Sequence, residues 1–515
     1  MEIATYISNR CGKKTKMKNT IQHTIESLAL ACLVILFHTI PAAAQTAAGQ
    51  TVNVKSYGAV GDGVHNDSAS FQQAIVYAAS HQETLFVPKG TYVISNLAAL
   101  SHLHMQGEDS SSILLLVSKS LANKTQCLIL NKNTSDVDIE NISFNANGLN
   151  NSSKSAFCVW TNLTPGQIDG IRFNQCFFTG SKGYGAMFLI GTAGSITNVS
   201  ITNCSFNNTG ASSMQLRGVA GMTFSGNSLS NWAQLDKDNA AVSLQSQENT
   251  GLVFTNNTFT NGNAGHFAIE CAGAYTRNSQ FIGNTFNANG LGAAGISGYF
   301  SNCLFKSNRH LSGGGDHRSG YELVGDNDTV CNTYVDNGTI TISTTPPFGN
   351  EKGGNGYLIT DDTVIGRNKN GMCLGIGGAD TVKNAVIENN IFDNRNASGS
   401  APAIAIGARG LVSGLIIRGN TLYGAGLSSC IRFNVTSPGT PFPAGYTYVC
   451  ENVTIEKNNF IGQKGVRFDK PGNWKGIEFK DNDFSQISTK VFDQDTQPLT
   501  SDIKVRRNRM PASQQ

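Results

Sequence analysis

One eight-residue pattern recurs along the chain and constrains its fold more than any other feature. The pattern reads apolar, any, apolar, any, any, Asn or Cys, any, Phe or Leu. Its clear copies are IRFNQCFF (171–178), VSITNCSF (199–206), MTFSGNSL (222–229), LVFTNNTF (252–259), SQFIGNTF (279–286), GYFSNCLF (298–305), AVIENNIF (385–392), LIIRGNTL (415–422), VTIEKNNF (453–460), IEFKDNDF (477–484) and IKVRRNRM (503–510). VDIENISF (137–144) has Ile142 in the Asn place, and degenerate copies surround Asn332 and Asn368. Such self-similarity indicates one repetitive domain.

The distances between copies vary, which favours strand repeats over helical ones. Helical repeats keep a nearly constant length, whereas a coil of short strands absorbs insertions in its turns. Each copy alternates apolar and polar residues, and a second alternating segment often precedes it, as Met214–Arg217 precedes 222–229. We therefore predict an all-β parallel solenoid over residues 45–515, in which each coil hydrogen-bonds to the next about 4.8 Å away.

Stacked coils place equivalent residues in columns. We predict that Asn227, Asn257 and Asn284 form an internal amide ladder, with Cys176 and Cys204 in the same column. The repeat also creates Asn-x-Ser/Thr sequences, for example at 203–205 and 256–258. We interpret these as turn and ladder chemistry rather than glycosylation sites, because a laddered amide would be buried.

The cysteines do not indicate a zinc site. Two of the 12 lie in residues 1–44, and the other ten form no CxxC pair. Export would permit disulfides, but we interpret these residues as small buried hydrophobes of the solenoid.

The first 44 residues resemble a secretory signal. A basic stretch ends at Lys18, an apolar run covers Leu28 to Phe37, and a small-residue cleavage pattern follows at 41–45. The apolar run is too short for a membrane anchor. We predict a signal peptide over 1–44 and a secreted, extracellular or periplasmic protein with no stable membrane insertion after its removal.

The predicted mature chain carries no general charge. Five of the 38 basic and two of the 35 acidic residues lie in 1–44, which leaves 33 of each. A balanced body provides no field to attract a polyanion as a whole, so we predict no nucleic-acid partner.

The start of the predicted mature chain resembles a known family. VKSYGAVGDGVHND (54–67), FQQAI (71–75) and LFVPKGTY (85–92) closely resemble the opening of the pectate lyase superfamily, in particular its rhamnogalacturonase/epimerase-like pectate lyase domains. The resemblance implies a single-domain right-handed parallel β-helix with an N-terminal cap at about 51–100. Glycines permit the tight turn, and Asn66 or Asp67 is expected to cap a helix that runs to about Ala79 and plugs the open end. These motifs indicate the fold and not the reaction.

The superfamily resemblance implies a site on one solenoid face, where outward side chains of successive strands meet a sugar polymer. Arg217, Gln245 and Glu270 each follow the second apolar residue of a predicted strand. We therefore expect these three side chains to lie side by side, one coil apart.

Acids and bases also precede two of these strands, as Asp236-Lys237-Asp238 and Gly265-His266. Their order resembles the paired-Asp coil and Gly-His coil of polygalacturonases, although the segment 208–210 lacks the Asp of that family's first motif and no Arg-Ile-Lys follows. One carboxylic acid of such a set protonates the leaving oxygen while others activate water. The predicted catalytic residues are Asp236, Asp238, His266 and Glu270. Solvated turn residues and a surface ion pair between Glu270 and Arg217 are the alternative interpretation.

A second set is predicted to bind substrate through charge, amide groups or ring stacking. It comprises Arg217, Lys237, Gln245, Trp232, Tyr299, Asp316, His317 and Arg318. Trp160 and Trp474 are further aromatic candidates, and a plain glycine-rich turn is the alternative for 316–318.

These observations favour a polysaccharide-active enzyme, foremost a glycoside hydrolase that cleaves an acidic, pectin-like polymer. The alternatives are a lyase acting by β-elimination with Lys237 or Arg217 near a neutralised uronate, an epimerase, and a non-catalytic glycan-binding or adhesive surface protein. No cofactor and no metal site are predicted; calcium between neighbouring carboxylates belongs to the lyase alternative. The expected oligomeric state is a monomer or a homotrimer.

Overall fold

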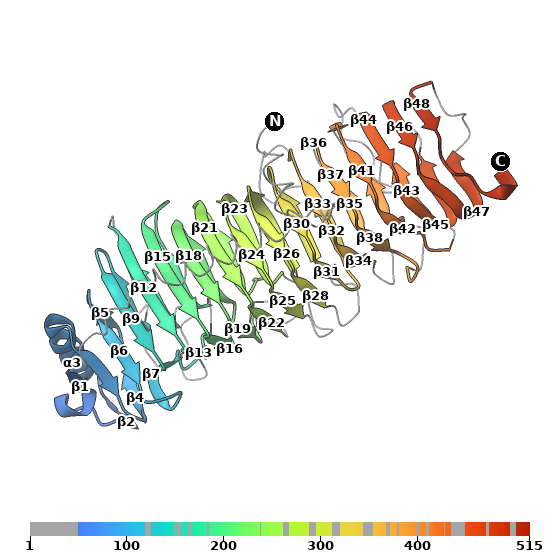
Figure 1. Ribbon diagram of the computed structural model, residues 1–515. Coiled ribbons are helices and arrows are strands. Elements are labelled where there is room, and N and C mark those ends of the chain that lie inside the picture. Colours follow the sequence, from blue (N-terminus) through green and yellow to red (C-terminus); the bar gives the residue numbers. More distant parts are fainter. Residues whose placement is uncertain are drawn as a thin grey trace, which may run out of the picture. The chain divides into compact units, whose positions relative to one another are not determined.

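The repeats form successive coils of parallel strands in the computed structural model (Figure 1). Contacts divide the chain into residues 1–50 and a unit spanning Thr51–Gln515. The structure describes residues 50–118, 125–148, 151, 156–162, 166–182, 185–236, 238–260, 267–287, 295–311, 320–342, 354–366, 371–377, 381–397, 401–407, 411–426, 428–433, 449–469, 473–494 and 501–514. The predicted signal peptide lies outside these residues. The helices of the described part include none long and apolar enough to cross a membrane.

The strands stack in three faces, and every pair is parallel, which confirms the predicted parallel β-helix. The first face contains β1 (Thr51–Asn53), β3 (Thr84–Val87), β6 (His104–Gly107), β9 (Ser135–Glu140), β12 (Ile168–Asn174), β15 (Ile196–Thr202), β18 (Val219–Ser225), β21 (Asn249–Thr255), β24 (Gln280–Ile282), β27 (Leu304–Lys306), β30 (Thr329–Cys331), β33 (Leu358–Thr360), β37 (Val386–Glu388), β41 (Ile416–Arg418), β44 (Val449–Glu456), β46 (Asn473–Lys480) and β48 (Ile503–Arg506). Two further short strands extend this face: β36 (Thr381–Lys383) pairs with β40 (Leu411–Ser413), and β40 pairs with β44.

The second face contains β2 (Asp62–Asn66), β4 (Gly90–Ile94), β7 (Ser112–Leu116), β10 (Ser143–Asn145), β13 (Phe177–Thr179), β16 (Ser205–Asn207), β19 (Ser228–Ser230), β22 (Thr258–Thr260), β25 (Thr285–Asn287), β28 (Arg309–Leu311), β31 (Tyr334–Val335), β34 (Thr363–Ile365), β38 (Ile391–Asp393) and β42 (Thr421–Tyr423).

The third face contains β5 (Leu97–Ala99), β8 (Thr125–Asn131), β11 (Ala156–Asn162), β14 (Gly185–Ile190), β17 (Ser212–Arg217), β20 (Val242–Gln245), β23 (Ile269–Arg277), β26 (Gly295–Ser301), β29 (Gly320–Val324), β32 (Thr339–Ile342), β35 (Leu374–Ile376), β39 (Ile404–Ile406) and β43 (Ser429–Phe433). The long strands β45 (Asn459–Phe468) and β47 (Asp483–Gln494) run through both the second and third faces.

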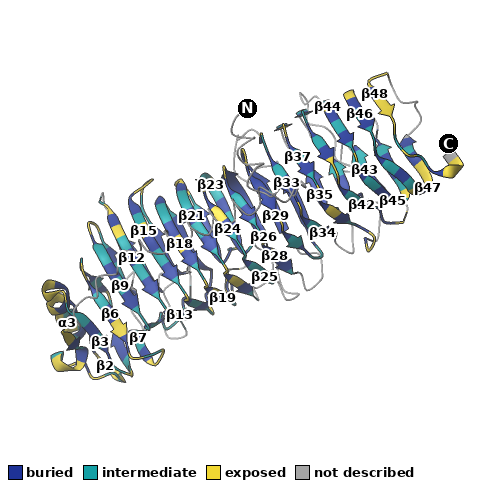
Figure 2. Ribbon diagram, in the orientation of Figure 1, coloured by how far each residue is buried: buried dark blue, intermediate teal, exposed yellow. Residues whose placement is uncertain are grey.

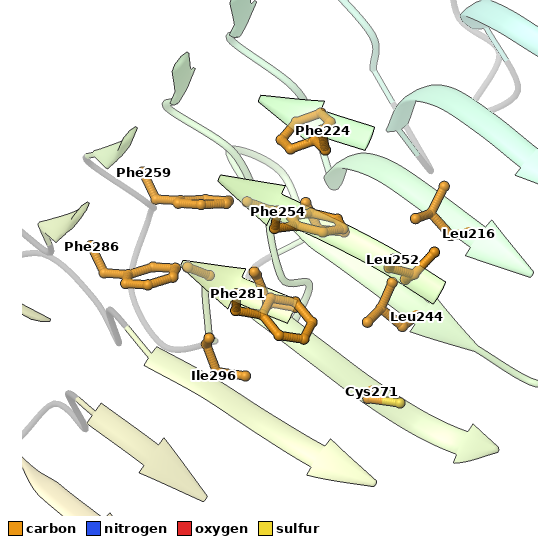
Figure 3. Close-up of a cluster of buried hydrophobic side chains, with 14 of the residues drawn as sticks. Leu216, Phe224, Leu244, Leu252, Phe254, Phe259, Cys271, Phe281, Phe286 and Ile296 are labelled. Carbon is orange, nitrogen blue, oxygen red and sulfur yellow. The ribbon is translucent and has the colours of Figure 1, made fainter. Parts of the chain in front are cut away.

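The core is built from apolar residues that repeat once per coil. Phe224, Phe254 and Phe281 come from consecutive first-face strands and are fully buried (Figure 3). The ring centroids of Phe224 and Phe254 lie 4.9 Å apart, and those of Phe254 and Phe281 lie 5.3 Å apart. Strand alternation therefore points an apolar residue inward on these successive coils, as the repeat predicts.

One helix packs at the start of the coil. Helix α3 (Ser68–His81) buries its apolar residues and leaves its outer side exposed (Figure 2). It ends two residues later than the predicted Ala79. Asp67 precedes it, but its carboxylate accepts hydrogen bonds from the amides of Val60 and Gly61 and not from the helix. Asp67 thus ties the glycine turn to the helix start, and a short 3-10 helix, η1 (Val54–Tyr57), precedes that turn.

The predicted amide ladder lies between the first and second faces. Asn227 Nδ2 donates to Asn257 Oδ1 at 3.0 Å, Asn257 Nδ2 to Asn284 Oδ1 at 2.9 Å, and Asn284 Nδ2 to Asn308 Oδ1 at 3.1 Å. The same amides donate to a carbonyl of the preceding coil. A second run joins Asn390, Asn420, Asn458, Asn482 and Asn508. Each buried amide is satisfied by its neighbours in the stack.

The ladder also corrects the predicted register of the degenerate copies. Thr333 and Asp362, and not Asn332, take the ladder places between the two runs. Asn368 lies outside the described residues. In the copy at 298–305, Cys303 belongs to another column, where its amide donates to Asp328 Oδ1. Asn308 takes the ladder place of that coil. In this coil the ladder residue lies a few positions later in the sequence than the pattern predicts, and a search for the sequence pattern does not detect such a shift.

A column of left-handed residues precedes the ladder. Asn203 and Asn256 have φ values of 54° and 55°, and both are exposed. The expectation that the asparagines of these Asn-x-Ser/Thr sequences are buried ladder amides is therefore wrong. Gly226, with φ 66°, takes the same place between them, and a Cβ there would lie 2.7 Å from Asn203 Oδ1. Glycine leaves room for the amide stacked beside it.

All ten cysteines of the described unit are buried and lie outside disulfides, which confirms their interpretation as small hydrophobes. Cys176 and Cys204 stack as predicted, since the Cys176 amide donates to Cys204 Sγ at 3.4 Å and the Cys204 amide to Asn227 Oδ1 at 2.8 Å. Burial raises the pKa of Cys158 to about 12 and that of Cys176 well above its usual range, so these thiols stay protonated.

The first prediction concerns the ladder. Asn257→Ala removes the side-chain oxygen that accepts from the backbone and side-chain N–H groups of Asn227, and it removes a donor to the Phe224 carbonyl, so we expect the free energy of unfolding to fall by about 3 kcal/mol. Denaturant unfolding measures this change. Asn256→Gly is the matched control, because the Asn256 side chain is exposed and its positive φ suits glycine. This variant should change the free energy of unfolding by less than about 0.5 kcal/mol. Equal effects would contradict the ladder.

The second prediction concerns Asp362, a carboxyl in an otherwise amide-rich column. Its Oδ2 is buried and has no hydrogen-bond partner among the described residues, and burial raises its pKa well above the ordinary 3.8. The folded protein then keeps a proton that the unfolded chain loses, so stability is greatest below that ordinary value and falls as pH rises toward the folded pKa.

Asp362→Asn should remove this part of the fall in stability with pH, because an amide provides an N–H donor at this position and does not titrate. Melting temperatures of both proteins across about pH 4 to 8 test it. Asp328, equally buried with a raised pKa, retains its own contribution in the variant. If the melting temperatures of the two proteins differ by the same amount at every pH, Asp362 is not the group responsible for this pH dependence.

Candidate functional site

The third face carries a column of outward side chains that we call the outer column. Its inward neighbours, such as Leu216, Leu244 and Leu323, belong to the buried core, so alternation turns the intervening residues away from the core. Strand register aligns the members of the column about 4.8 Å apart. They are Trp160, Phe188, Gln215, Ser243, Glu270, Ser297, Glu322, Thr341, Gly375, Ala405, Arg432, Arg467 and Asp493.

Two carboxylates occupy the centre of the outer column. Glu270 and Glu322 pair with the same residue, Ser297, from opposite sides, so two strand spacings of about 9.6 Å separate their backbones. Ser297 Oγ donates to Glu322 Oε2 at 3.4 Å. Inverting glycosidases hold their two carboxyl groups roughly 6.5–9.5 Å apart, with room for a water between them. Two flexible Glu side chains on backbones about 9.6 Å apart can bring their carboxyl groups within that range.

Sequence reasoning selected Glu270 but missed Glu322. The signal was available, because Glu322 lies between the buried Tyr321 and Leu323 just as Glu270 lies between Ile269 and Cys271. An isolated Glu between two apolar residues is common, so only the strand register shows that these two belong together.

The predicted neighbours of Glu270 are in part wrong. Arg217 and Gln245 do lie side by side, and Arg217 Nη2 donates to Gln245 Oε1 at 3.5 Å. Gln245 pairs with Ala272, however, and Glu270 pairs with Ser243. The register differs by two residues because Ile269 and Cys271 are the inward pair of this strand, not Phe267 and Ile269. Arg217 and Gln245 thus flank the outer column, and Gln245 Nε2 donates to Ser243 Oγ at 2.8 Å.

Asp236 and Asp238 are exposed and lie in the turn before β20. The Asp236 amide donates to the Gly210 carbonyl at 2.9 Å, and the Asp238 amide to Asp236 Oδ1 at 3.5 Å. These contacts are those of a turn, and a catalytic role stays a prediction. Lys237, His266, Asp316, His317 and Arg318 lie outside the described residues.

The expected placement of two aromatic residues on the outer face is wrong. Trp232 is 2% exposed and Tyr299 is 1% exposed, so neither ring can stack on a sugar. Tyr299 pairs with the buried Val324, and Trp232 joins the core cluster where the chain leaves β19. A large ring in a turn fills the space at the corner of a coil, which sequence alone does not reveal.

Other rings take the expected place. Trp160 is partly exposed at one end of the outer column, and its ring lies 5.6 Å from that of Phe188 and 5.2 Å, stacked, from that of Phe157. Trp474 is also partly exposed but packs edge-on against Phe433 at 5.5 Å. Trp160 is therefore the aromatic candidate in register with the carboxylates. Among the residues described, no group of three or more His, Cys, Asp or Glu side chains has the arrangement of a metal site.

Comparison with known proteins agrees with this architecture. Residues 51–267 match the model of the family described as rhamnogalacturonase A/epimerase, pectate lyase-like. The match covers less than half of the chain and supports the predicted resemblance of this segment to the pectate lyase superfamily. The match includes the strands that precede Glu270, up to β22, and ends just before β23, so the carboxylate pair itself lies beyond it.

Individual relatives are distant. The plasmin and fibronectin-binding protein A of Streptococcus pneumoniae is 39% identical over 66 residues, which is 12% of this chain and 9% of that protein's length. The A-module of a mannuronan C-5 epimerase from Azotobacter vinelandii has a TM-score of 0.38 at 16% identity, covering 88% of this chain and all of that one. The catalytic unit of an alpha-1,3-glucanase from Streptomyces thermodiastaticus has a TM-score of 0.36 at 16% identity, covering 91% and 70%.

The third prediction tests the corrected role of Trp232. Trp232→Ala should lower the free energy of unfolding by about 3–5 kcal/mol, because it removes a large buried side chain. Leu235→Ala is the control: this side chain, three residues away, is 65% exposed and should contribute less than about 0.5 kcal/mol. Denaturant unfolding of both variants gives the comparison. If Trp232→Ala kept its stability and lost only glycan binding, the result would contradict the buried, structural role of Trp232.

Proposed function

We propose that this protein is a polysaccharide-active enzyme that hydrolyses an acidic, pectin-like polymer with Glu270 and Glu322 as its carboxylate pair. The observation that carries the proposal is the register of these residues on either side of Ser297. In inverting hydrolysis one carboxylic acid protonates the glycosidic oxygen and the other carboxylate activates water on the opposite side of the sugar. The description of the family matched by residues 51–267 supports a pectin-like substrate.

The neighbouring residues suit a sugar chain that runs along the outer column. Gln215 and Ser243 are only 5% and 1% exposed, so the partly exposed Gln245 offers the hydrogen-bonding amide beside the outer column, and the partly exposed Trp160 offers a ring for stacking. Asp236, Asp238 and His266 remain candidates for further acid or base roles. Export from the cell, with removal of 1–44, is part of the same proposal, because a polymer of this size is met outside the cell.

β-Elimination is the second candidate, favoured by the position of Arg217 beside the outer column. A cation there would neutralise a uronate and assist removal of its C5 proton, with Lys237 as a further base. Hydrolysis by two carboxyl groups requires no cofactor, whereas a calcium ion would belong to the elimination. Insensitivity to a chelator therefore accompanies hydrolysis.

The fourth prediction tests the carboxylate pair. We expect the purified protein to release reducing ends from polygalacturonate or rhamnogalacturonan without the ultraviolet absorbance of unsaturated products. Glu270→Gln and Glu322→Gln should each lower kcat by about 100-fold or more, because each removes one proton-transfer group. Glu388→Gln is the control, since this carboxylate pairs with Arg418 on the first face.

Each outcome selects one function. Absorbing products that require calcium would establish elimination instead of hydrolysis. Binding without turnover on pectic polymers and on alginate would leave the glycan-binding alternative. Full turnover in both Gln variants would show that the pair is not catalytic and return attention to Asp236 and Asp238.

A further inference from the structure

The second face carries a regular set of polar side chains on four consecutive strands, β16, β19, β22 and β25. The first outward residues of these strands pair directly with one another and form a straight column: Ser205, Ser228, Thr258 and Thr285. A second column lies two residues further along each strand: Asn207, Ser230, Thr260 and Asn287. We call these two columns the hydroxyl array.

The hydroxyl array has a fixed spacing in two directions. Neighbours within a column are one strand spacing apart, about 4.8 Å, and the two columns are two residues apart along the strand, about 6.6 Å. The residues between the columns point inward and are fully buried, among them Phe259 and Phe286 (Figure 3). Their rings stack with centroids 4.9 Å apart. This packed layer holds the outward side chains in a rigid arrangement.

The hydroxyl array is accessible to solvent. Ser228 and Thr258 are exposed, and the other members are partly exposed. In the second column Ser230 Oγ donates to Asn207 Oδ1 at 3.2 Å. The hydroxyl groups of the first column, in contrast, form no hydrogen bond with another residue that the structure describes. The first column therefore offers one uncommitted hydroxyl group per coil.

This part of the second face carries no charge. From β10 to β25, neither the outward residues of the face nor the left-handed column beside it include a charged side chain, and the uncharged run ends at Arg309 on β28. Phe177 lies in the first column, one strand before Ser205, and is 41% exposed. An uncharged ligand would leave no charge unpaired here, whereas a uronate would find no cation to neutralise it.

We propose that the hydroxyl array binds an uncharged polysaccharide whose chain lies along the axis of the solenoid. Hydroxyl and amide groups both donate and accept hydrogen bonds, as the hydroxyl groups of a sugar require. One sugar unit of an extended chain is about as long as one strand spacing, so each coil presents its groups to a successive unit. The exposed ring of Phe177 adds a stacking position at one end.

The rigidity of the array favours binding of a repeating ligand. Thr258 and Thr285 are β-branched and restricted at χ1, so ligand binding costs little side-chain freedom. The site lies on another face than Glu270 and Glu322, and the inference does not depend on the proposed function. The alternatives are a face that contacts only water and a face that binds ice, whose surface also repeats at regular intervals.

The fifth prediction tests the array with uncharged probes. Affinity electrophoresis of the purified protein in gels containing mixed-linkage β-glucan, galactan or galactomannan should show retardation by at least one of them. Isothermal titration calorimetry with that polysaccharide gives the affinity, which should not change with salt because no charges meet. The double variant Thr258→Val, Thr285→Val should bind about tenfold more weakly, because two hydroxyl contacts are lost while the β-branched shape is kept.

Further variants separate binding from folding. Thr258→Glu should weaken binding at least as much, because the ligand would desolvate an unpaired carboxylate. Thr223→Glu is the matched control: Thr223 is an exposed outward residue of β18 on the first face, and its replacement should leave the affinity unchanged. Thr258→Ser keeps the hydroxyl group and should retain binding. Thermal melting of each variant shows that it is folded.

Several results would overturn the inference. Absence of retardation by all three polysaccharides would leave a face that contacts only water. Wild-type affinity in the double valine variant would place the binding elsewhere on the protein, and loss of binding in Glu270→Gln would place it on the third face. Arrest of ice growth by the wild type and not by the double valine variant, without polysaccharide binding, would assign the array to ice.

Discussion

Parallel stacking in fixed register is the constraint on which the rest of this protein depends. Each coil offers backbone donors and acceptors that only the next coil satisfies, and the corners add side-chain amides that do the same. Asn257, for instance, accepts at Oδ1 from one neighbour and donates at Nδ2 to the next. A residue that breaks this exchange leaves buried polar groups without partners. Asp362 shows how the column tolerates an acid: burial keeps its proton in place.

The same register organises the outer surface. Successive coils contribute one outward residue each, so a change in composition along the chain becomes a change along a line in space. The outer column passes from rings at Trp160 and Phe188, through Glu270 and Glu322, over small residues, to Arg432 and Arg467. The body as a whole is balanced in charge, so the proposed recognition of an anionic polymer would depend on local groups and not on a general field.

Much of the fold was predictable because its signals are local. The Asn repeat predicted the ladder, the glycine-rich opening predicted the turn and helix α3, and the positions of cysteines within the repeat predicted buried thiols. Less of the site was predictable. Glu270 was placed beside Gln245, but the strand register pairs it with Ser243, and Glu322 was not selected. Trp232 has the character of a sugar-stacking residue in sequence and yet fills a corner of the core.

The sequence by itself determined that this chain forms a coil of parallel strands, since alternation and the Asn position are properties of each repeat alone. Only the tertiary structure decided which residues meet on the third face. The physical reason is that a strand exposes every second residue, so a shift of one residue turns a side chain from the surface into the core, and a shift of two moves it to the adjacent column. The length of the turns sets that shift, and turn length varies from coil to coil.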